Sequence, residues 1–211
     1  MALARKTLGL RENLKEEERR KQIKEAAINV FSSRGYDQTS LDDLVREAGI
    51  SKSLLYWYWG SKAALLKDLI DICMVSYLEL LQAAVDSDEP YMTKMHSLLW
   101  DCLNLFRENE KLNKVVHFCS LHTGKQPQED FGPQVDRYYE KYTDLLEALF
   151  RQGMEQGAIE NNSDVEAMSL GVMCLIEGYI YMSILGGRMP LDRILTQVFS
   201  AFIFGERLTV Q

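Results

Sequence analysis

The polar and aromatic side chains between positions 39 and 62 are the first feature of the sequence that could do chemistry. Hydroxyl groups, amines and a run of aromatic rings share these 24 residues. Such groups donate hydrogen bonds to phosphate oxygens and to the edges of bases. We therefore take nine of them as candidate contacts to a polyanion: Thr39, Ser40, Ser51, Lys52, Ser53, Tyr56, Trp57, Tyr58 and Lys62.

The distribution of charge favours an anionic partner at one end of the chain. Residues 1–62 hold 12 Lys and Arg against 9 Asp and Glu, whereas residues 63–211 hold 12 against 22. The net charge of −7 therefore combines a cationic front of +3 with an acidic body of −10. This asymmetry is typical of a protein that meets a polyanion at one face only.

Three predicted helices position the candidate residues. Apolar residues at helical spacing predict a first helix over residues 16–34, closed by a glycine. Thr39 and Ser40 both offer N-caps for a short second helix, with Asp43 completing a capping box with Ser40, and Ser51 can cap a third over residues 52–58. Two short helices joined by Gly-Ile-Ser are typical of a helix-turn-helix, whose second helix enters the major groove of DNA. The apolar stripe of the first helix consists of Ile23, Ala27, Val30 and Phe31.

The segment 39–66 strongly resembles the DNA-binding signature of the TetR (tetracycline-repressor-like) family of transcriptional regulators. It reads T-S-L-D-D-L-V-R-E-A-G-I-S-K-S-L-L-Y-W-Y-W-G-S-K-A-A-L-L. The resemblance implies an all-α fold, in which a three-helix DNA-binding domain precedes a helical bundle that forms a homodimer. It also implies a cytoplasmic, ligand-responsive regulator, most simply a repressor released from a palindromic operator in double-stranded DNA.

The resemblance assigns roles to several of the candidate contacts. Tyr56 and Lys62 match the family's phosphate-binding tyrosine and lysine, and Thr39 can offer its hydroxyl or backbone N–H to a phosphate. Lys52 and Ser53 lie where base edges are read, and a lysine there favours the O6 and N7 atoms of guanine.

Other positions depart from the family pattern or serve the fold. Leu55 and Trp59 lie four residues apart and are expected to face inward. Leu54 replaces a small polar residue, and Asp42 puts an acid near the expected DNA surface. The operator of a relative therefore does not transfer to this chain. A helix-turn-helix that binds no DNA is the alternative interpretation.

The composition of the whole chain favours helices. Of 211 residues, 46% are hydrophobic, and only 13 Gly and 4 Pro are present. Residues 168–185 contain a single charge, Glu177, and are interpreted as a buried helix of a soluble protein rather than a membrane span. No signal-peptide pattern is recognised, so a reducing compartment with free, buried thiols is expected. The cysteines are Cys73, Cys102, Cys119 and Cys174.

The breaks between predicted helices suggest three regions. Residues 1–15 are expected to form a mobile arm, residues 16–61 the DNA-binding domain, and residues 62–211 a ligand-binding and dimerisation domain. Within the last region, two apolar stripes with steps of three and four predict core helices. They comprise Met92, Met95, Leu99, Cys102 and Phe106, and Val135, Tyr138, Tyr142, Leu145 and Leu149.

The resemblance places a dimer surface and a ligand pocket in the last region. The last two helices, near residues 164–185 and 191–206, form the implied dimer surface, and the final one offers a stripe of Leu195, Val198, Phe199, Phe202 and Ile203. Polar and aromatic residues on apolar helices are the pocket candidates, and one carboxylate among rings suits an aromatic, apolar or cationic molecule. They are Cys73, Tyr77, His96, Trp100, His117, Tyr138, Tyr142, Met173, Glu177 and Tyr181.

Two other classes of protein are the alternatives. A helical metal-binding protein or enzyme of ferritin-like kind needs Glu-x-x-His pairs, which the sequence lacks. Cys119 and His122 share a helical spacing but are too few for a metal site. A helical ligand-binding protein without a DNA role is the remaining alternative. The sequence therefore predicts no enzyme activity, cofactor or metal.

Overall fold

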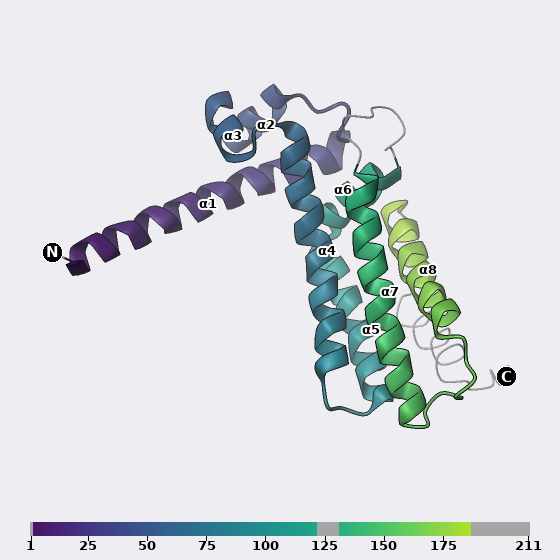
Figure 1. Ribbon diagram of the computed structural model, residues 1–211. Coiled ribbons are helices and arrows are strands. Elements are labelled where there is room, and N and C mark those ends of the chain that lie inside the picture. Colours follow the sequence, from purple (N-terminus) through teal and green to yellow (C-terminus); the bar gives the residue numbers. More distant parts are fainter. Residues whose placement is uncertain (1, 122–130, 187–211) are drawn as a thin grey trace. The chain divides into compact units, whose positions relative to one another are not determined.

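The computed structural model describes residues 2–121 and 131–186, and every element in these ranges is an α-helix (Figure 1). The predicted all-helical class is thereby confirmed. The helices are α1 (Ala2–Arg34), α2 (Leu41–Ala48), α3 (Lys52–Trp59), α4 (Lys62–Asp86), α5 (Tyr91–Glu108), α6 (Glu110–Leu121), α7 (Gly132–Glu155) and α8 (Val165–Ile184).

The chain divides into two compact units. The first comprises residues 1–73 and 114–131, and the second comprises residues 74–113 and 132–211. The boundary predicted at residue 62 coincides with the start of α4. The first unit continues past that point to Cys73, so α4 contributes its first three turns to one unit and the rest to the other.

The first unit is built around the packing of α1, α2 and α3. Ile23, Ala27 and Phe31 on α1 are almost fully buried, as are Leu44 on α2 and Leu55 on α3. This confirms the predicted apolar stripe of the first helix. Burial of large aliphatic and aromatic side chains stabilises such a unit by about 1.5–3 kcal/mol for each residue.

The start of α1 differs from the prediction. The helix begins at Ala2 rather than Glu16, so the predicted start is wrong. Figure 1 shows α1 continuing well beyond α2 and α3. Hydrophobic periodicity predicts the buried face of a helix, so a helix without such a period is missed. Residues 2–15 consist mostly of good helix formers such as Ala, Leu, Arg and Lys. The mobility of residues 1–15 stays a prediction.

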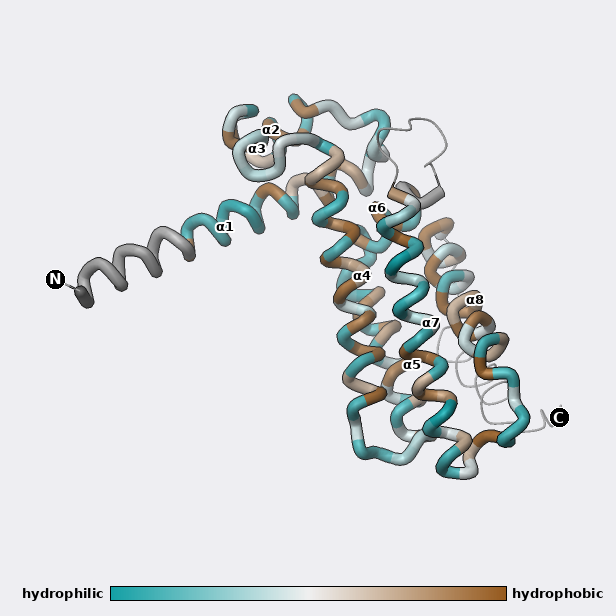
Figure 2. The backbone as a smooth tube through the Cα atoms, viewed as in Figure 1, coloured by the Kyte–Doolittle hydropathy of each residue, from teal (hydrophilic) through white to brown (hydrophobic). Residues whose placement is uncertain are grey.

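The second unit places the predicted core stripe of α5 inside. Met95, Leu99, Cys102 and Phe106 are buried, whereas Met92 is 41% exposed, so the stripe is one turn shorter than predicted. The Phe106 ring packs edge-on against Tyr179 of α8, with ring centroids 5.8 Å apart. Figure 2 shows hydrophobic residues recurring along α4 and α8.

The prediction that residues 168–185 form a buried helix is wrong for the described part of the chain. α8 has the length and apolar composition of a membrane span, yet only 17% of its 18-residue apolar window is buried within the structure. Cys174 on α8 is exposed, whereas Cys73 and Cys102 are buried, so the expectation of buried thiols holds for only two of these three. The exposed apolar residues of α8 and its end are Leu170, Leu175, Tyr181, Met182 and Leu185.

Candidate nucleic-acid interface

Two caps fix the ends of the helix-turn-helix. Ser40 Oγ accepts a hydrogen bond from the Asp43 backbone N–H at 3.2 Å, and the Asp43 carboxylate accepts one from the Ser40 N–H at 3.0 Å. Hydrogen bonds from the Ser40 hydroxyl and backbone, and then the nearby Arg34 and Arg46, lower the pKa of Asp43. Ser51 Oγ accepts from the Leu54 N–H at 3.3 Å. The predicted capping box and both N-caps are confirmed.

The inner side of α3 is held by apolar and aromatic contacts. Leu55 is 1% exposed, as predicted. Trp59 is half-buried and donates from Nε1 to the Asp68 carboxylate at 2.9 Å. The Arg20 guanidinium of α1 lies over the rings of Tyr58 and Trp59, 4.8 and 5.6 Å from their centroids. These contacts attach the last turn of α3 to α1 and α4.

The outer side of α3 carries the candidate DNA contacts. Lys52, Ser53, Tyr56 and Trp57 are all exposed, and the two rings are 47% and 68% exposed. Residues separated by four positions lie one above the other on a helix, so these four form one continuous strip. A strip with an amine, a hydroxyl, a phenol and an indole can read base edges and bind phosphate oxygens.

Lys52 is held by an acid from the preceding helix. Its Nζ lies 2.8 Å from Asp42 Oδ1 and 2.9 Å from Oδ2, and both side chains are more than half exposed. The sequence indicates Asp42 as an acid near the DNA surface but does not predict this pair. The amine proposed to read a base is thus paired with a carboxylate in the free protein.

Three further candidates are engaged inside the first unit. Thr39 is 2% exposed, and both of its donors are used: Oγ1 donates to the Gly35 carbonyl at 2.7 Å and the backbone N–H to the Tyr36 carbonyl at 3.1 Å. Lys62 Nζ donates to the Tyr36 and Thr39 carbonyls at 3.0 Å each. Tyr58 is half-buried beneath Arg20. These side chains position the helix-turn-helix.

Comparison with known proteins identifies the family. The profile of the bacterial regulatory proteins of the tetR family matches residues 23–69. The HTH-type transcriptional regulators YezE and YvdT of Bacillus subtilis (strain 168) are each 30% identical to this chain. The YezE match covers 68% of this chain and 74% of the relative, and the YvdT match covers 74% and 77%. The chain belongs to the TetR family.

The fold of the chain agrees with this assignment. The crystal structure of the TetR-family regulator PfmR from Thermus thermophilus aligns with a TM-score of 0.72 over 88% of this chain and 99% of that one, at 22% identity. The protein is therefore a DNA-binding transcriptional regulator, which is not an enzymatic role. TetR-family regulators are soluble, bind operator DNA, act as dimers and respond to small molecules.

The predicted ligand residues are distributed over both units. Cys73 and His117 belong to the first, and the others belong to the second. His96, Trp100 and Tyr181 are exposed, so they do not line an enclosed cavity in the single chain.

Three further candidates of the second unit are buried or half-buried. Tyr77 Oη donates to Asn113 Oδ1 at 2.9 Å, and Tyr142 Oη donates to the Met74 carbonyl at 2.7 Å. Tyr138 is half-buried on the same helix as Tyr142.

Glu177 and Met173 both face α7. Tyr139 Oη donates to the Glu177 carboxylate at 3.1 Å, and the Thr143 hydroxyl donates to Met173 Sδ at 3.3 Å. The sequence did not predict Tyr139, whose phenol gives Glu177 a neutral partner.

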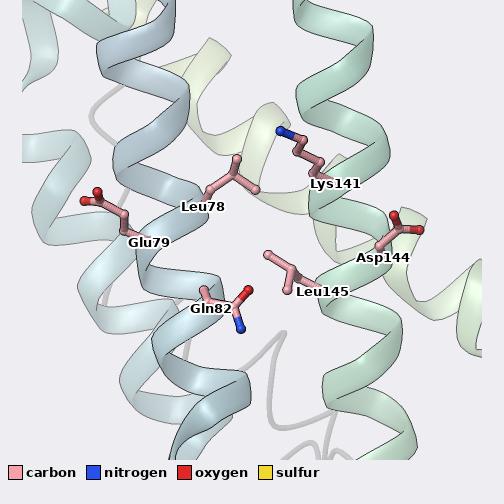
Figure 3. Close-up of a pocket in the computed structure, with 6 residues that line it drawn as sticks. All are labelled: Leu78, Glu79, Gln82, Lys141, Asp144 and Leu145. Atoms are coloured by element: carbon pink, nitrogen blue, oxygen red, sulfur yellow. The ribbon is translucent and has the colours of Figure 1, made fainter.

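A groove of about 350 Å³ also opens between α4 and α7, and its six lining residues include none of the predicted ligand contacts. Figure 3 shows Leu78 and Leu145 facing each other across it, with the Lys141 amine directed toward α4. The other lining residues are Glu79, Gln82 and Asp144. The dimer candidates Leu195, Val198, Phe199, Phe202 and Ile203 lie outside the described residues.

Proposed function

We propose that the protein is a cytoplasmic repressor that reads a palindromic operator through α3 and is released by a small ligand bound in the second unit. The exposed strip of Lys52, Ser53, Tyr56 and Trp57 carries this proposal. Lys52 and Ser53 contact base edges in the major groove, and Tyr56 contacts a phosphate through its hydroxyl. Trp57 offers its indole N–H or its ring face to the DNA backbone.

The contacts of Thr39 and Lys62 modify their proposed roles. Thr39 has given both donors to carbonyls within the protein, so it holds the turn before α2 rather than a phosphate. Lys62 has three donors and uses two of them. Its third N–H, together with its charge, reaches a phosphate near the start of α4. Ser40 and Ser51 orient the N-termini of α2 and α3, where exposed N–H groups favour anions.

A second copy of the chain covers the apolar face of α8. Leu170, Cys174, Tyr181 and Leu185 follow one another at spacings of four and seven residues and are all exposed. Four such positions form one stripe of a helix, and burying them against a copy removes apolar surface from water. Two copies of α3 can then bind two half-sites, which gives the specificity that a single recognition helix lacks.

The ligand is an apolar aromatic or cationic molecule that contacts Glu177 together with Tyr77 and Tyr142. Glu177 lies on α8, the helix that carries the proposed dimer face, and Tyr77 lies on α4, which begins at Lys62 beside the helix-turn-helix. A ligand that moves either helix changes the separation of the two recognition helices. A coupling of about 1–3 kcal/mol gives a roughly 5–150-fold loss of operator affinity.

A gel shift with the DNA upstream of the protein's own gene tests the proposal. A discrete shift that resists shuffled competitor DNA is expected, and candidate cationic aromatic molecules should reverse it. Glu177→Gln should weaken that reversal and leave ligand-free affinity unchanged. If Glu177→Gln breaks the dimer while ligand affinity stays intact, the ligand assignment is wrong. Absence of any DNA binding would favour the alternative of a helical ligand-binding protein without a DNA role.

A further inference from the structure

The recognition helix α3 depends on its surroundings for its direction. It has eight residues, and a helix of that length is not stable in isolation. Leu55 is the only one of these eight residues that is buried. One core contact fixes where the helix lies but not the angle at which it crosses the unit. Contacts at the two ends of α3 must therefore set that angle.

The first end of α3 is fixed by the turn before it. Ser51 caps the first turn of the helix. Gln22 Nε2 of α1 donates to the Ala48 carbonyl at the end of α2, at 2.8 Å. These contacts hold the backbone of the turn, so they position Lys52 and Ser53, which follow it directly.

The last turn of α3 is held by side chains from two other helices. Trp59 Nε1 donates to Asp68 Oδ2 of α4 at 2.9 Å. Lys24 Nζ of α1 lies 3.8 Å from the same oxygen. The Arg20 guanidinium lies 4.8 Å from the Tyr58 ring centroid and 5.6 Å from that of Trp59. The Asp68 carboxylate is therefore the acceptor at which α1, α3 and α4 meet.

The hydrogen bond from Trp59 is the contact that gives this end of α3 a direction. The backbone between α3 and α4 consists of Gly60 and Ser61, and a glycine permits many angles. The ion pair of Lys24 and Asp68 is long and partly exposed, so it contributes little. A hydrogen bond to a carboxylate is short and directional, and it is stronger than one to a neutral acceptor. It also fixes the plane of the indole ring.

We propose that Asp68 is a positioning residue for operator binding, which sets the angle of α3 by accepting the hydrogen bond from Trp59. This rests on the proposed function in that α3 is the helix that contacts the DNA. Tyr56 and Trp57 lie three and two residues before Trp59, so a change of angle in this turn displaces both. Binding groups must lie within about 0.5 Å of their productive positions. The charge of Asp68 repels phosphates, so its contribution to binding is geometric.

The test compares three full-length variants with the parent by fluorescence anisotropy, on upstream DNA and on a shuffled duplex. Asp68→Ala and Asp68→Asn remove the same negative charge, but only asparagine keeps an acceptor oxygen. They are therefore matched in charge and differ in the hydrogen bond. Trp59→Phe keeps an aromatic ring and the carboxylate and removes the N–H donor.

The hydrogen bond predicts the order of the affinities. Asp68→Ala and Trp59→Phe should each bind upstream DNA about tenfold more weakly than the parent, a loss within the strength of one hydrogen bond to a charged group. Asp68→Asn should bind at least as tightly as the parent, because it keeps the acceptor and loses a charge that repels DNA. Combining Trp59→Phe with Asp68→Ala should cost no more than Trp59→Phe alone, because both changes remove the same bond.

The indole N–H of Trp59 gives a readout that does not depend on DNA. The chain has three tryptophans, so the indole region of a ¹⁵N–¹H spectrum is simple, and the signal missing from Trp59→Phe identifies Trp59. This signal should keep its position in Asp68→Asn. In Asp68→Ala it should shift and exchange faster with solvent. Urea unfolding of each variant shows whether it is folded under the titration conditions. If Asp68→Ala does not fold, Trp59→Phe and Asp68→Asn make the same comparison.

The outcomes separate this inference from the proposed function. Parent-like DNA affinity of Asp68→Ala and Trp59→Phe overturns the inference, even when the parent selects its operator, because the hydrogen bond then serves stability alone. Asp68→Asn that binds as weakly as Asp68→Ala also overturns it, since the acceptor oxygen is then not the cause. A parent that binds both duplexes equally removes the operator proposal, and the order of the affinities still tests the inference. A parent that binds neither duplex overturns both.

Discussion

Replacing Asp42 by asparagine should strengthen DNA binding. In the free protein the Asp42 carboxylate lies 2.8 Å from the Lys52 amine, the cation of α3 that is proposed to read a base. A lysine that donates to a guanine gives up part of this ion pair. The carboxylate then stays beside the phosphates and is repelled by them. Asparagine keeps the size of the side chain, and it removes both the ion pair that Lys52 must give up and the repulsion between the carboxylate and the phosphates.

The geometry sets the magnitude of the effect. Both side chains are more than half exposed, and an exposed ion pair contributes about 0.2–1 kcal/mol. A carboxylate about 8 Å from a phosphate is repelled by about 0.5 kcal/mol in water before screening by salt. Removing the acid should therefore gain about 1 kcal/mol for each half-site. A dimer on two half-sites gains about 2 kcal/mol, or roughly 30-fold in affinity.

Fluorescence anisotropy with upstream and shuffled duplexes measures the effect directly. The affinity for the shuffled duplex should rise at least as much as that for upstream DNA, so discrimination should fall or stay constant. Glu47→Gln on the same helix is the matched control, since it removes the same charge from an exposed position five residues away. If Asp42→Asn binds upstream DNA no better than the parent, or more weakly, the reasoning is refuted. The Asp42 carboxylate would then be a group that orients Lys52 or contacts a base.

Four further predictions concern stability, thiol reactivity and dimerisation. Gly153→Ala should destabilise the second unit by about 1–3 kcal/mol in urea unfolding, because an added Cβ would lie 2.9 Å from the Tyr91 ring, and an unchanged midpoint would contradict this packing. Because folding lowers the pKa of Asp43, the ionised carboxylate stabilises the fold fully at pH values above its ordinary pKa of 3.8, and this stabilisation is lost as the pH falls through the lowered pKa. Asp43→Asn should therefore make the dependence of unfolding on acid pH less steep. Burial raises the pKa of Cys102 to about 12, so maleimide at neutral pH should label it only after unfolding. Labelling of Cys174 should slow as protein concentration rises, and a constant rate would place α8 outside the dimer interface.

Local signals in the sequence were sufficient to predict the helix-turn-helix. Ser40, Asp43 and Ser51 act within three residues of their partners, so their caps depend on short spacings that the sequence displays. The burial of Leu55 follows from helical periodicity in the same way. The start of α1 at Ala2 was not predicted, because the sequence before Glu16 shows no sustained apolar period.

Contacts between distant segments could not be predicted in this way. Lys62 and the carbonyl of Tyr36 are 26 residues apart, and Arg20 meets Tyr58 across 38 residues. Periodicity gives the face on which a side chain lies but not the partner of that face. For the same reason Trp100 is a reasonable pocket candidate by type, yet the structure exposes it.

The central claim, that the exposed strip of α3 reads the operator, is tested most directly by the binding of Lys52→Ala and Tyr56→Phe to upstream and shuffled DNA. Lys52→Ala should relax the preference at one position in each half-site by about 1–3 kcal/mol, measured with single base-pair changes. Tyr56→Phe should lower affinity for both duplexes equally, because it removes a phosphate contact. Equal losses on every sequence for both variants would contradict base reading by Lys52. Parent-like binding by both variants would contradict the role of α3.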